Sequence, residues 1–457
     1  MSGLGLVLAF VMAVAVMLMA ISKFKVHPFL ALMGTSLLLA MCVGLPLAKI
    51  PEVIGSGFSG IFSSIGIVII LGALIGAILE KTGAALKLAD GVVRMVGRKR
   101  PDLAIELMGW IVSVPVFCDS GFVILDPIRK ALCRKTRHSS VAMTVALSAG
   151  LYTSHVLMPP TPGPIAAAGA LGIGHLLLLV IGVGAVVSIP CLVAAYFFAA
   201  FIGRRVKSVE DDAEQTGIGY EELLKSFGEL PGGFLSIAPI VMPILAMAMS
   251  SVSAALGWKG GLASALAFLG APIIALTVGL LFGLVLLIRA GKAGTFTSLT
   301  NETLRIVGPI LFITAAGGVL GKVIASAGFV GIMQAHASAL SALGIFFPFL
   351  VSAILKTAQG SSTVAMTTTA GIMGGVADPG SMMHLLGLTS PAAAALTVMS
   401  IALGAMVVSH ANDSYFWVVT NFGGIKAEDG YKTQTAVTLV MALAGMPFIW
   451  LLSRIFA

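Results

Sequence analysis

The sequence predicts an all-α polytopic membrane protein. Of its 457 residues, 58% are apolar and only 10% are charged, whereas a soluble domain carries about 25% charged residues. Apolar runs of about 20 residues, which cross a hydrocarbon core roughly 30 Å thick as helices, recur along the chain. This composition excludes a soluble enzyme, a nucleic-acid-binding module and a disordered chain. The formal charge of +8 comes from Lys and Arg residues in the loops between the apolar runs.

About ten apolar segments are long enough to be transmembrane helices. They lie near residues 3–22, 27–45, 61–80, 141–171, 175–202, 235–256, 263–289, 306–325, 391–422 and 434–453. The segments 141–171 and 391–422 are too long for one span and contain polar residues in the middle, which predicts broken helices. The stretches 102–133 and 345–375 are each split at a polar tip into two short arms, which predicts re-entrant hairpins.

Basic residues predict the orientation of these segments, because cytoplasmic loops are enriched in Lys and Arg. The loop 81–100 and the segment 129–137 are both strongly basic, so the hairpin between them is expected to enter from the cytoplasm and return. The flanks of the second hairpin, 326–344 and 376–390, contain no Lys or Arg. That hairpin is therefore expected to enter from the opposite side.

An internal repeat accounts for this mirror relation. The sequence GALIGAILEKTGA from Gly72 aligns with GGVLGKVIASAGF from Gly317, an offset of 245 residues. Each half then contains five full crossings, an odd number, so the two halves have opposite topology. We expect a first inverted repeat over 1–202, a cytoplasmic linker over 203–234 and a second inverted repeat over 235–457.

Four polar breaks interrupt the membrane segments, two in each repeat. The hairpin tips are Pro115–Phe122 and Lys356–Val364, and the helix breaks are Thr153–Pro164 and Ser409–Trp417. Irregular backbone at membrane depth persists only when protein buries it or when it lines a wet cavity. The four breaks therefore predict one central site, where helix N-termini attract an anion and unwound carbonyls hold a cation or water.

At these residues the sequence resembles the gluconate permease family of bacterial symporters, within the ion-transporter superfamily. The resemblance covers nearly the whole chain. Four segments carry it in the right order: VPVFCDSGFVILDP, HVLMPPTPGPIAAAG, AQGSSTVAMTTTAG and SHANDSYFWVVT.

The resemblance implies an elevator-type secondary transporter, multi-pass in the bacterial inner (plasma) membrane, that imports sugar acids with protons. It implies no enzyme activity, cofactor or metal. The expected partners are a small anionic substrate, a coupling proton and the lipid bilayer, without nucleic acid; a homodimer is left open. Thr161 stands where the family often has His, and Cys118, Ser120 and Tyr415 also depart from it. A smaller hydroxycarboxylate is therefore as plausible a substrate as gluconate.

Four residues at the breaks are candidates for proton coupling: Asp119, His155, His410 and Asp413. A charge at mid-membrane is costly, so such residues are usually functional, and removal from water favours a protonated carboxyl group. Histidine titrates in the physiological range. The alternatives are that Asp119 and Asp413 only cap helices and that the histidines are satisfied buried donors.

Ten residues at the breaks are candidates for substrate binding, because they offer hydroxyl groups, amides or close backbone approach. They are Ser120, Gly121, Thr161, Gln359, Gly360, Ser361, Ser362, Thr363, Asn412 and Ser414. The hydroxyl groups could instead bond neighbouring backbone, as is common in membrane helices. Lys356 either contacts the substrate or extends toward the membrane interface.

Other functions remain open at this point. One alternative is a sodium- or proton-coupled importer of a small amino acid such as D-serine. A channel is a second, although two dead-end hairpins argue against an open pore. An intramembrane enzyme that uses Asp119 and Asp413 is a third, but no metal motif or nucleophile–base pattern accompanies them.

Overall fold

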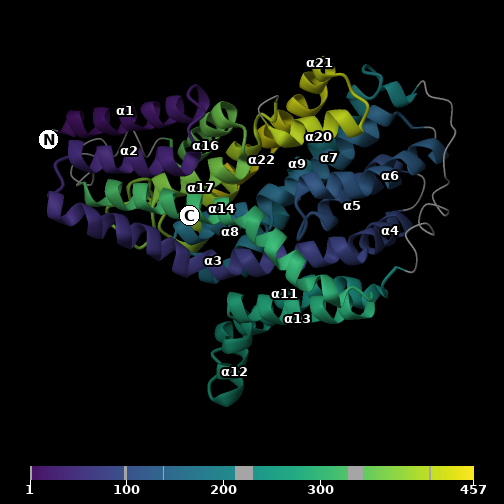
Figure 1. Cartoon of the computed structure of the whole chain (residues 1–457), viewed down its shortest axis with the longest axis horizontal. Helices are drawn as coiled ribbons and strands as arrows, with labels where there is room; N and C mark the ends of the chain where they lie inside the picture. Colours follow the sequence, from purple (N-terminus) through teal and green to yellow (C-terminus); the bar gives the residue numbers. More distant parts are fainter. Residues whose placement is uncertain are drawn as a thin grey trace.

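The computed structural model describes residues 3–96, 100–136, 138–211, 230–327, 343–410 and 413–456. Within these ranges the chain forms helices, turns and connecting segments, without a β-strand. Most of the long helices lie side by side along the long axis of the molecule (Figure 1). The all-α prediction is therefore confirmed for the part of the chain that the structure describes. Asn412 lies outside it.

The first half of the chain contains the helices α1 to α9. Their bounds are α1 (Gly3–Ser22), α2 (Pro28–Cys42), α3 (Ile50–Thr82), α4 (Ala84–Val96), α5 (Pro101–Val112), α6 (Cys118–Thr136), α7 (Ser140–Leu157), α8 (Pro162–Ala170) and α9 (Leu177–Ile202). The segment 102–133 therefore holds two short helices, α5 and α6. The segment 141–171 holds α7 and α8.

The second half follows a similar order of helix lengths. Its main helices are α11 (Gly233–Ala255), α12 (Gly261–Gly270), α13 (Pro272–Arg289), α14 (Phe296–Ser326), α16 (Phe346–Gln359), α17 (Ser362–Met373), α19 (Pro391–Met406), α20 (Ser414–Phe422) and α22 (Ala436–Phe456). The short helices α18 (Met382–Leu385) and α21 (Ala427–Gly430) complete it. The segment 345–375 holds α16 and α17, and 391–422 holds α19 and α20.

The breaks are encoded by a few residues that cannot continue a helix. Gly360 ends α16 in the left-handed conformation, with φ of +86°, and Ser361 caps α17 by accepting a hydrogen bond from the amide of Val364. Between α7 and α8, Pro159 and Pro160 have no amide hydrogen to continue the helical ladder, and Thr161 has the extended backbone that precedes Pro162.

The expected single span 263–289 is wrong. The structure divides it into α12 and α13 at Ala271, whose ψ of 130° is extended. The next residue is Pro272, and a residue before proline is disfavoured in the α-helical region, so the break follows from local sterics. In Figure 1, α12 projects away from the body of the molecule.

Six helical segments among the described residues are long and apolar enough to cross a membrane, and the bent pair formed by the end of α3 and α4 would make a seventh. They are Ser140–Ala170, Gly174–Ile202, Gly233–Ala254, Pro272–Arg289, Ala293–Ile324 and Ala427–Phe456. Shorter apolar helices, such as α2 and α19, accompany them. The chain is thus an integral membrane protein with several apolar helices, and the total of ten stays a prediction.

The glycine motif that marks the internal repeat lies at two helix contacts. A Cβ at Gly76 of α3 would collide with the carbonyl oxygen of Pro115, at the turn between α5 and α6. A Cβ at Gly321 of α14 would collide with the carbonyl oxygen of Gly371 in α17. Only glycine permits such close backbone approach. The repeated glycines thus let α3 and α14, which pack against each other, each approach one of the short-helix pairs.

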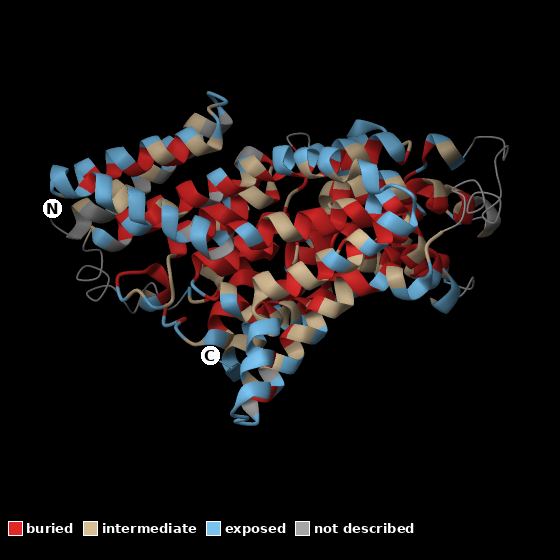
Figure 2. Cartoon of the chain, turned by 60° about the horizontal axis from the view of Figure 1, so that its bottom comes forward, coloured by how far each residue is buried: buried red, intermediate tan, exposed pale blue. Residues whose placement is uncertain are grey.

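The buried core runs through the middle of the molecule (Figure 2). Every residue of α7 and of α8 is buried. The helices α9, α13 and α22 instead bury one face and expose large apolar side chains on the other. Exposed apolar faces on long helices are the surface that a bilayer covers.

Candidate functional site

The polar breaks converge on one cavity of about 310 Å³. It lies among the start of α6, the C-terminal part of α7, the tip between α16 and α17, and the start of α20. Its lining residues are Phe117, Cys118, Asp119, Tyr152, His155, Gly360, Ser361, Ser362, Thr363, Asp413, Ser414 and Tyr415. A volume of this size suits a small ligand.

The lining residue Asp413 belongs to a buried ion pair with Lys356, which lies outside the lining set. Lys356 in the last turn of α16 is fully buried, and its Nζ lies 2.6 Å from Oδ2 of Asp413. The same ammonium group donates to the carbonyl oxygen of Gly360. Asp413 also accepts hydrogen bonds from Ser409 Oγ at 2.6 Å and from the amide of Tyr415 at 3.1 Å, and so caps α20. The pair links the α16–α17 tip to the start of α20.

Asp119 lies in the first turn of α6, on the other side of the cavity. Ser414 Oγ donates to its Oδ1 at 3.2 Å, and Cys118 Sγ lies 3.6 Å from its Oδ2. Neither contact brings a positive charge. Among the residues that the structure describes, the ion pairs leave Asp119 without a cationic partner. The carboxyl group is thus held by neutral donors.

Two tyrosines and a histidine form the aromatic wall. The rings of Tyr152 and Tyr415 stack with centroids 5.2 Å apart, and Lys356 Nζ lies 5.7 Å from the centroid of Tyr152. The hydroxyl of Tyr152 hydrogen-bonds Ser362 Oγ at 2.5 Å, whereas that of Tyr415 donates to the carbonyl oxygen of Ser148 at 3.1 Å. The ring of His155 stacks on Tyr152 at 6.5 Å.

Three helices begin at the cavity: α6 at Cys118, α17 at Ser362 and α20 at Ser414. The first amide groups of a helix have no partner within the helix and carry the positive end of its dipole. Together with Lys356 they make the site suited to bind an anion, because the dipoles and the ammonium group attract the same charge. The hydroxyl groups around them offer further hydrogen bonds.

The cavity brings together most of the candidate residues. Asp119, His155, Asp413 and the substrate candidates Gly360, Ser361, Ser362, Thr363 and Ser414 line it. Nδ1 of His155 is buried and has no hydrogen-bond partner among the described residues. These residues come from both halves of the chain.

The other candidates have different surroundings. Ser120 and Gly121 lie in the first turns of α6, outside the lining set. Thr161 Oγ1 donates to the carbonyl oxygen of Met158 at 2.5 Å, and His410 Nε2 lies 3.0 Å from the carbonyl oxygen of Thr357. Gln359 ends α16, and its side chain lies outside the described part, as does Asn412.

The lining also contains residues that were not among the candidates. Tyr152 directly precedes the predicted break that begins at Thr153, and this position next to a break was its only sequence signal. Lys356 is not a lining residue but pairs with the lining residue Asp413, and it had a sequence signal, since a lysine within an apolar stretch needs a partner. The sequence did not show that its partner is Asp413, 57 positions away.

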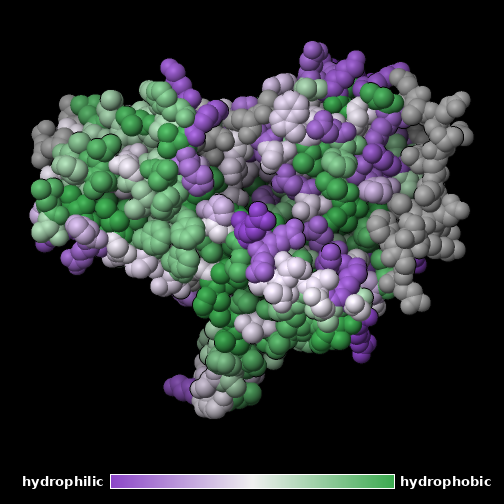
Figure 3. All heavy atoms as spheres, in the orientation of Figure 1, coloured by the Kyte–Doolittle hydropathy of each residue, from purple (hydrophilic) through white to green (hydrophobic). Residues whose placement is uncertain are grey.

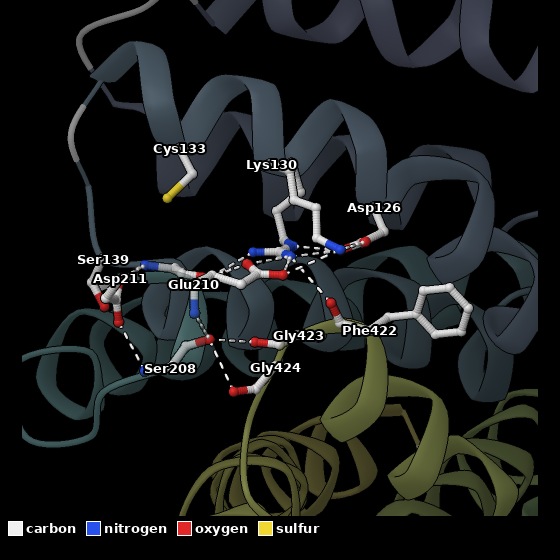
Figure 4. Close-up of polar contacts among 12 residues, drawn as sticks. Asp126, Lys130, Cys133, Ser139, Ser208, Glu210, Asp211, Phe422, Gly423 and Gly424 are labelled. Atoms are coloured by element: carbon white, nitrogen blue, oxygen red, sulfur yellow. Dashed lines mark hydrogen bonds and ion pairs between the residues drawn. The ribbon is translucent and has the colours of Figure 1, made fainter. Parts of the chain in front are cut away.

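A second cluster of buried charge, which shares no residue with the cavity lining, surrounds Arg129 of α6. Figure 4 labels its members Asp126, Lys130 and Glu210. The fully buried guanidinium group contacts Asp126 Oδ1 at 2.7 Å, Glu210 Oε2 at 2.9 Å and Ser140 Oγ at 2.8 Å. Lys130 Nζ lies 2.7 Å from Asp126 and 3.2 Å from Glu210. This cluster joins α6, the start of α7 and the segment that follows α9.

Glu210 belongs to this connecting segment. Its partial burial alone would raise the pKa of the carboxyl group, but Arg129, a hydrogen bond from Ser140 and Lys130 together hold that pKa below its ordinary value. The carboxylate form is therefore favoured. Ser208 adds a hydrogen bond from its Oγ to the carbonyl oxygen of Gly423 at 2.7 Å, which ties the segment to the end of α20.

Comparison with known proteins identifies the family. The family model described as GntP family permease matches residues 5–455. The chain is 33% identical to the inner membrane permease YgbN of Escherichia coli K12, over 96% of each protein. It is 30% identical to the gluconate permease of Pseudomonas aeruginosa, over 96% of this chain and 95% of that one. It is 29% identical to the low-affinity gluconate transporter of Escherichia coli K12, over 97% of each.

A solved structure has a similar fold. The YdaH transporter of Alcanivorax borkumensis superposes with a TM-score of 0.61, over 94% of this chain and 98% of that one, at 16% sequence identity. At this identity the similarity concerns the fold alone. The relatives are permeases and transporters rather than enzymes.

Proposed function

Because this chain belongs to the GntP family of permeases, we propose that it is a secondary active transporter in the bacterial inner membrane. It imports a gluconate-like sugar acid or a small hydroxycarboxylate by proton symport. The observation that carries this proposal is the cavity at the polar breaks, which combines three helix N-termini and several hydroxyl groups and whose lining residue Asp413 pairs with the buried ammonium group of Lys356. Relatives named gluconate permease support the same substrate class.

The substrate's two chemical parts match two parts of the cavity. Its carboxylate binds at the start of α17, where the helix dipole and Lys356 supply positive charge. Its hydroxyl groups exchange hydrogen bonds with Ser362, Thr363 and Ser414, whose hydroxyls both donate and accept. The stacked rings of Tyr152 and Tyr415 contact its carbon backbone.

Charge balance supports coupling to a proton at Asp119. Lys356 and Asp413 neutralise each other, so the ionised carboxylate of Asp119 leaves the empty cavity with a net negative charge. A substrate anion adds a second negative charge, and like charges repel strongly in the low dielectric of the protein interior. A proton on Asp119 removes that repulsion, so proton and substrate bind together. His155, which also lines the cavity, is the second candidate for carrying the proton.

We infer that transport proceeds by an elevator mechanism within an inverted-repeat architecture. The pairs α5–α6 and α16–α17 act as opposed re-entrant hairpins, which move with the cavity relative to α3 and α14. The repeats extend over 1–202 and 235–457, joined by a cytoplasmic linker. The close glycine contacts at Gly76 and Gly321 support this proposal, because a surface without protruding side chains lowers the steric barrier to sliding.

The function is tested with purified protein in liposomes. Radiolabelled gluconate, a three- or four-carbon hydroxy acid and D-serine are offered separately, each with an imposed pH gradient or an imposed sodium gradient. We expect saturable accumulation of a hydroxy acid or sugar acid, driven by the pH gradient and abolished by a protonophore. Accumulation of D-serine alone, or a dependence on sodium, would replace the proposal with the amino-acid alternative.

The role of Asp119 is tested with Asp119→Asn, which keeps the hydrogen bond to Ser414 but cannot exchange a proton. We expect the variant to lose pH-driven accumulation while it still exchanges labelled for unlabelled substrate across the membrane. Thr161→Val is the matched control, because Thr161 lies outside the cavity lining. Normal accumulation by Asp119→Asn would move the proton to His155.

A further inference from the structure

A second cavity, of about 520 Å³, lies at the end of α9 beside α21. Its lining residues are Phe201, Ile202, Arg205, Val206, Lys207, Lys426, Asp429 and Lys432. None of them lines the central cavity. The basic residues after α9 place this end of the helix on the cytoplasmic side of the membrane. Figure 3 shows hydrophilic atoms gathered over the surface where Figure 1 labels α21.

The charge of this basic cavity is unbalanced. Four of its lining residues are basic and one, Asp429, is acidic. Asp429 pairs with Lys432, whose Nζ lies 2.9 Å from its Oδ1. In the described part of the chain, no ion pair engages the other three basic residues, Arg205, Lys207 and Lys426. Three exposed cations around one hollow favour an anionic ligand.

Arg205 is positioned at the edge of the cavity by an aromatic contact. Its guanidinium carbon lies 4.2 Å from the centroid of the Phe201 ring. A cation–π contact of this kind orders the long side chain while the N–H groups stay free for another partner. A guanidinium group presents its donors in a planar fork that matches two oxygens of a phosphate.

An apolar stripe on α9 leads directly to the cavity. The side chains at positions 186, 189, 193, 197 and 201 recur every three or four residues, so they share one face of the helix. They are all large, apolar and at least 42% exposed: Val186, Ile189, Val193, Phe197 and Phe201. Phe201, the last of them, also lines the basic cavity. The apolar stripe of α9 thus ends at the basic cavity.

We propose that the basic cavity binds the phosphate headgroup of an anionic phospholipid from the cytoplasmic leaflet, with the acyl chains lying along the exposed stripe of α9. The phosphate contacts Arg205 and the ammonium groups of Lys207 and Lys426. A free phosphate ion shares the headgroup chemistry, but it leaves the apolar stripe unexplained. Basic residues close to the cytoplasmic membrane surface attract anionic lipids in this way.

This binding does not depend on the proposed transport function. The basic cavity and the central cavity share no lining residue, and the lipid is bound whatever substrate the protein carries. The two proposals can therefore fail separately. A protein that binds no lipid could still transport a sugar acid, and a protein that transports another substrate could still bind the lipid.

The test measures lipid binding to the purified full-length protein by native mass spectrometry. Phosphatidylglycerol and phosphatidylcholine are titrated separately, and inorganic phosphate is added as a competitor. The variant R205Q/K207Q/K426Q removes three exposed basic residues of the cavity. The matched control K23Q/K81Q/R289Q removes three exposed basic residues elsewhere. Because all six side chains are exposed, neither variant loses core packing, and R205E/K207E serves as a second cavity variant.

We expect wild type to prefer phosphatidylglycerol to phosphatidylcholine. The cavity variants should bind phosphatidylglycerol more weakly by a factor on the order of ten or more, and the control variant should bind as wild type does. Equal binding by wild type and cavity variants, or equal loss in the control, would overturn the proposal. Full displacement of phosphatidylglycerol by millimolar phosphate would assign the site to a soluble anion instead.

Discussion

Two clusters inside this molecule each contain a buried basic residue paired with a carboxylate, but their surroundings differ. One is centred on Arg129 and the other on Lys356. Arg129 and Lys356 are both fully buried, and both contact a carboxylate within 2.7 Å. Around Arg129 the remaining space is filled by Glu210, Ser140 and Lys130, and protein groups occupy its donors (Figure 4). The pair of Lys356 and Asp413 instead borders a cavity of about 310 Å³. We therefore expect the two clusters to serve different roles, because this cavity borders only the second.

The physical difference lies in what each cation does when it loses its carboxylate partner. The Arg129 cluster is a closed network in which each member stabilises connecting segments of the fold, so disruption leaves a buried charge unpaired. The Lys356 pair faces a space that a ligand can enter, and a substrate carboxylate can compete with Asp413 for the ammonium group. The first cluster is expected to affect folding, and the second transport.

The largest effect is expected from the double variant K356M/D413N, which removes the buried pair without leaving an unpaired charge. We expect it to insert and fold, but to lose substrate uptake by about 100-fold or more, since truncating a buried charged contact costs several kcal/mol. Uptake in liposomes and gel filtration of the purified protein check the two parts. Wild-type uptake would show that Lys356 and Asp413 only stabilise the fold.

The next effect is expected at Arg129→Met. Removing one partner of a buried ion pair costs about 3–5 kcal/mol of stability. Here Lys130 still contacts Asp126 and Glu210, so we expect the lower end of that range. We expect a lower thermal unfolding temperature and a lower yield, but an unchanged KM in the protein that folds. Arg129→Lys, which keeps the charge but loses the planar fork, should be intermediate. A raised KM with normal stability would contradict the assignment of this cluster to folding.

A smaller effect is expected from Tyr152→Phe. It removes the hydrogen bond that orients the hydroxyl of Ser362, a proposed substrate contact. Such a bond is worth about 1 kcal/mol, so KM should rise by at most roughly fivefold. Tyr415→Phe is the matched control, because its hydroxyl already donates to the carbonyl oxygen of Ser148. The control should lower thermal stability and leave KM unchanged. The reverse pattern would exchange the roles of the two tyrosines.

The smallest effect concerns Glu210 and pH. Because its pKa is lowered in the folded protein, Glu210 stabilises the fold above its unfolded pKa of about 4.3 and loses that contribution as pH falls below it. We expect the amides of Val209 and Asp211, which bond Gly424 and Ser208, to lose hydrogen-exchange protection in acid. The comparison is made after correction for intrinsic exchange rates. Glu210→Gln should show no such pH dependence.

The broad features of this protein could be predicted because composition and helix-breaking residues act locally. Few charges and long apolar runs allow only a membrane-embedded helical chain. Proline and glycine mark interruptions such as those at Pro159 and Gly360, although Pro190 and Pro309 lie inside continuous helices. The motifs at these interruptions were sufficient to indicate the permease family, which the match over residues 5–455 confirms.

The break between α12 and α13 was not predicted. Between residues 263 and 289 the apolar pattern is continuous, and Ala271 before Pro272 was the sole signal that α12 and α13 are separate helices. The continuous apolar run predicted one helix, whereas the steric restriction on the residue before proline separates two.

The sequence by itself determined that the chain is a helical membrane permease with interruptions in four of its segments, because hydrophobicity and backbone restriction are properties of neighbouring residues. Only the tertiary structure decided which charges meet. Lys356 pairs with Asp413, Arg129 pairs with Glu210, and Tyr152 meets Ser362 across 210 positions of sequence. Such contacts depend on how helices pack in three dimensions, and packing alone decides whether a buried charge is enclosed by protein or left facing a cavity.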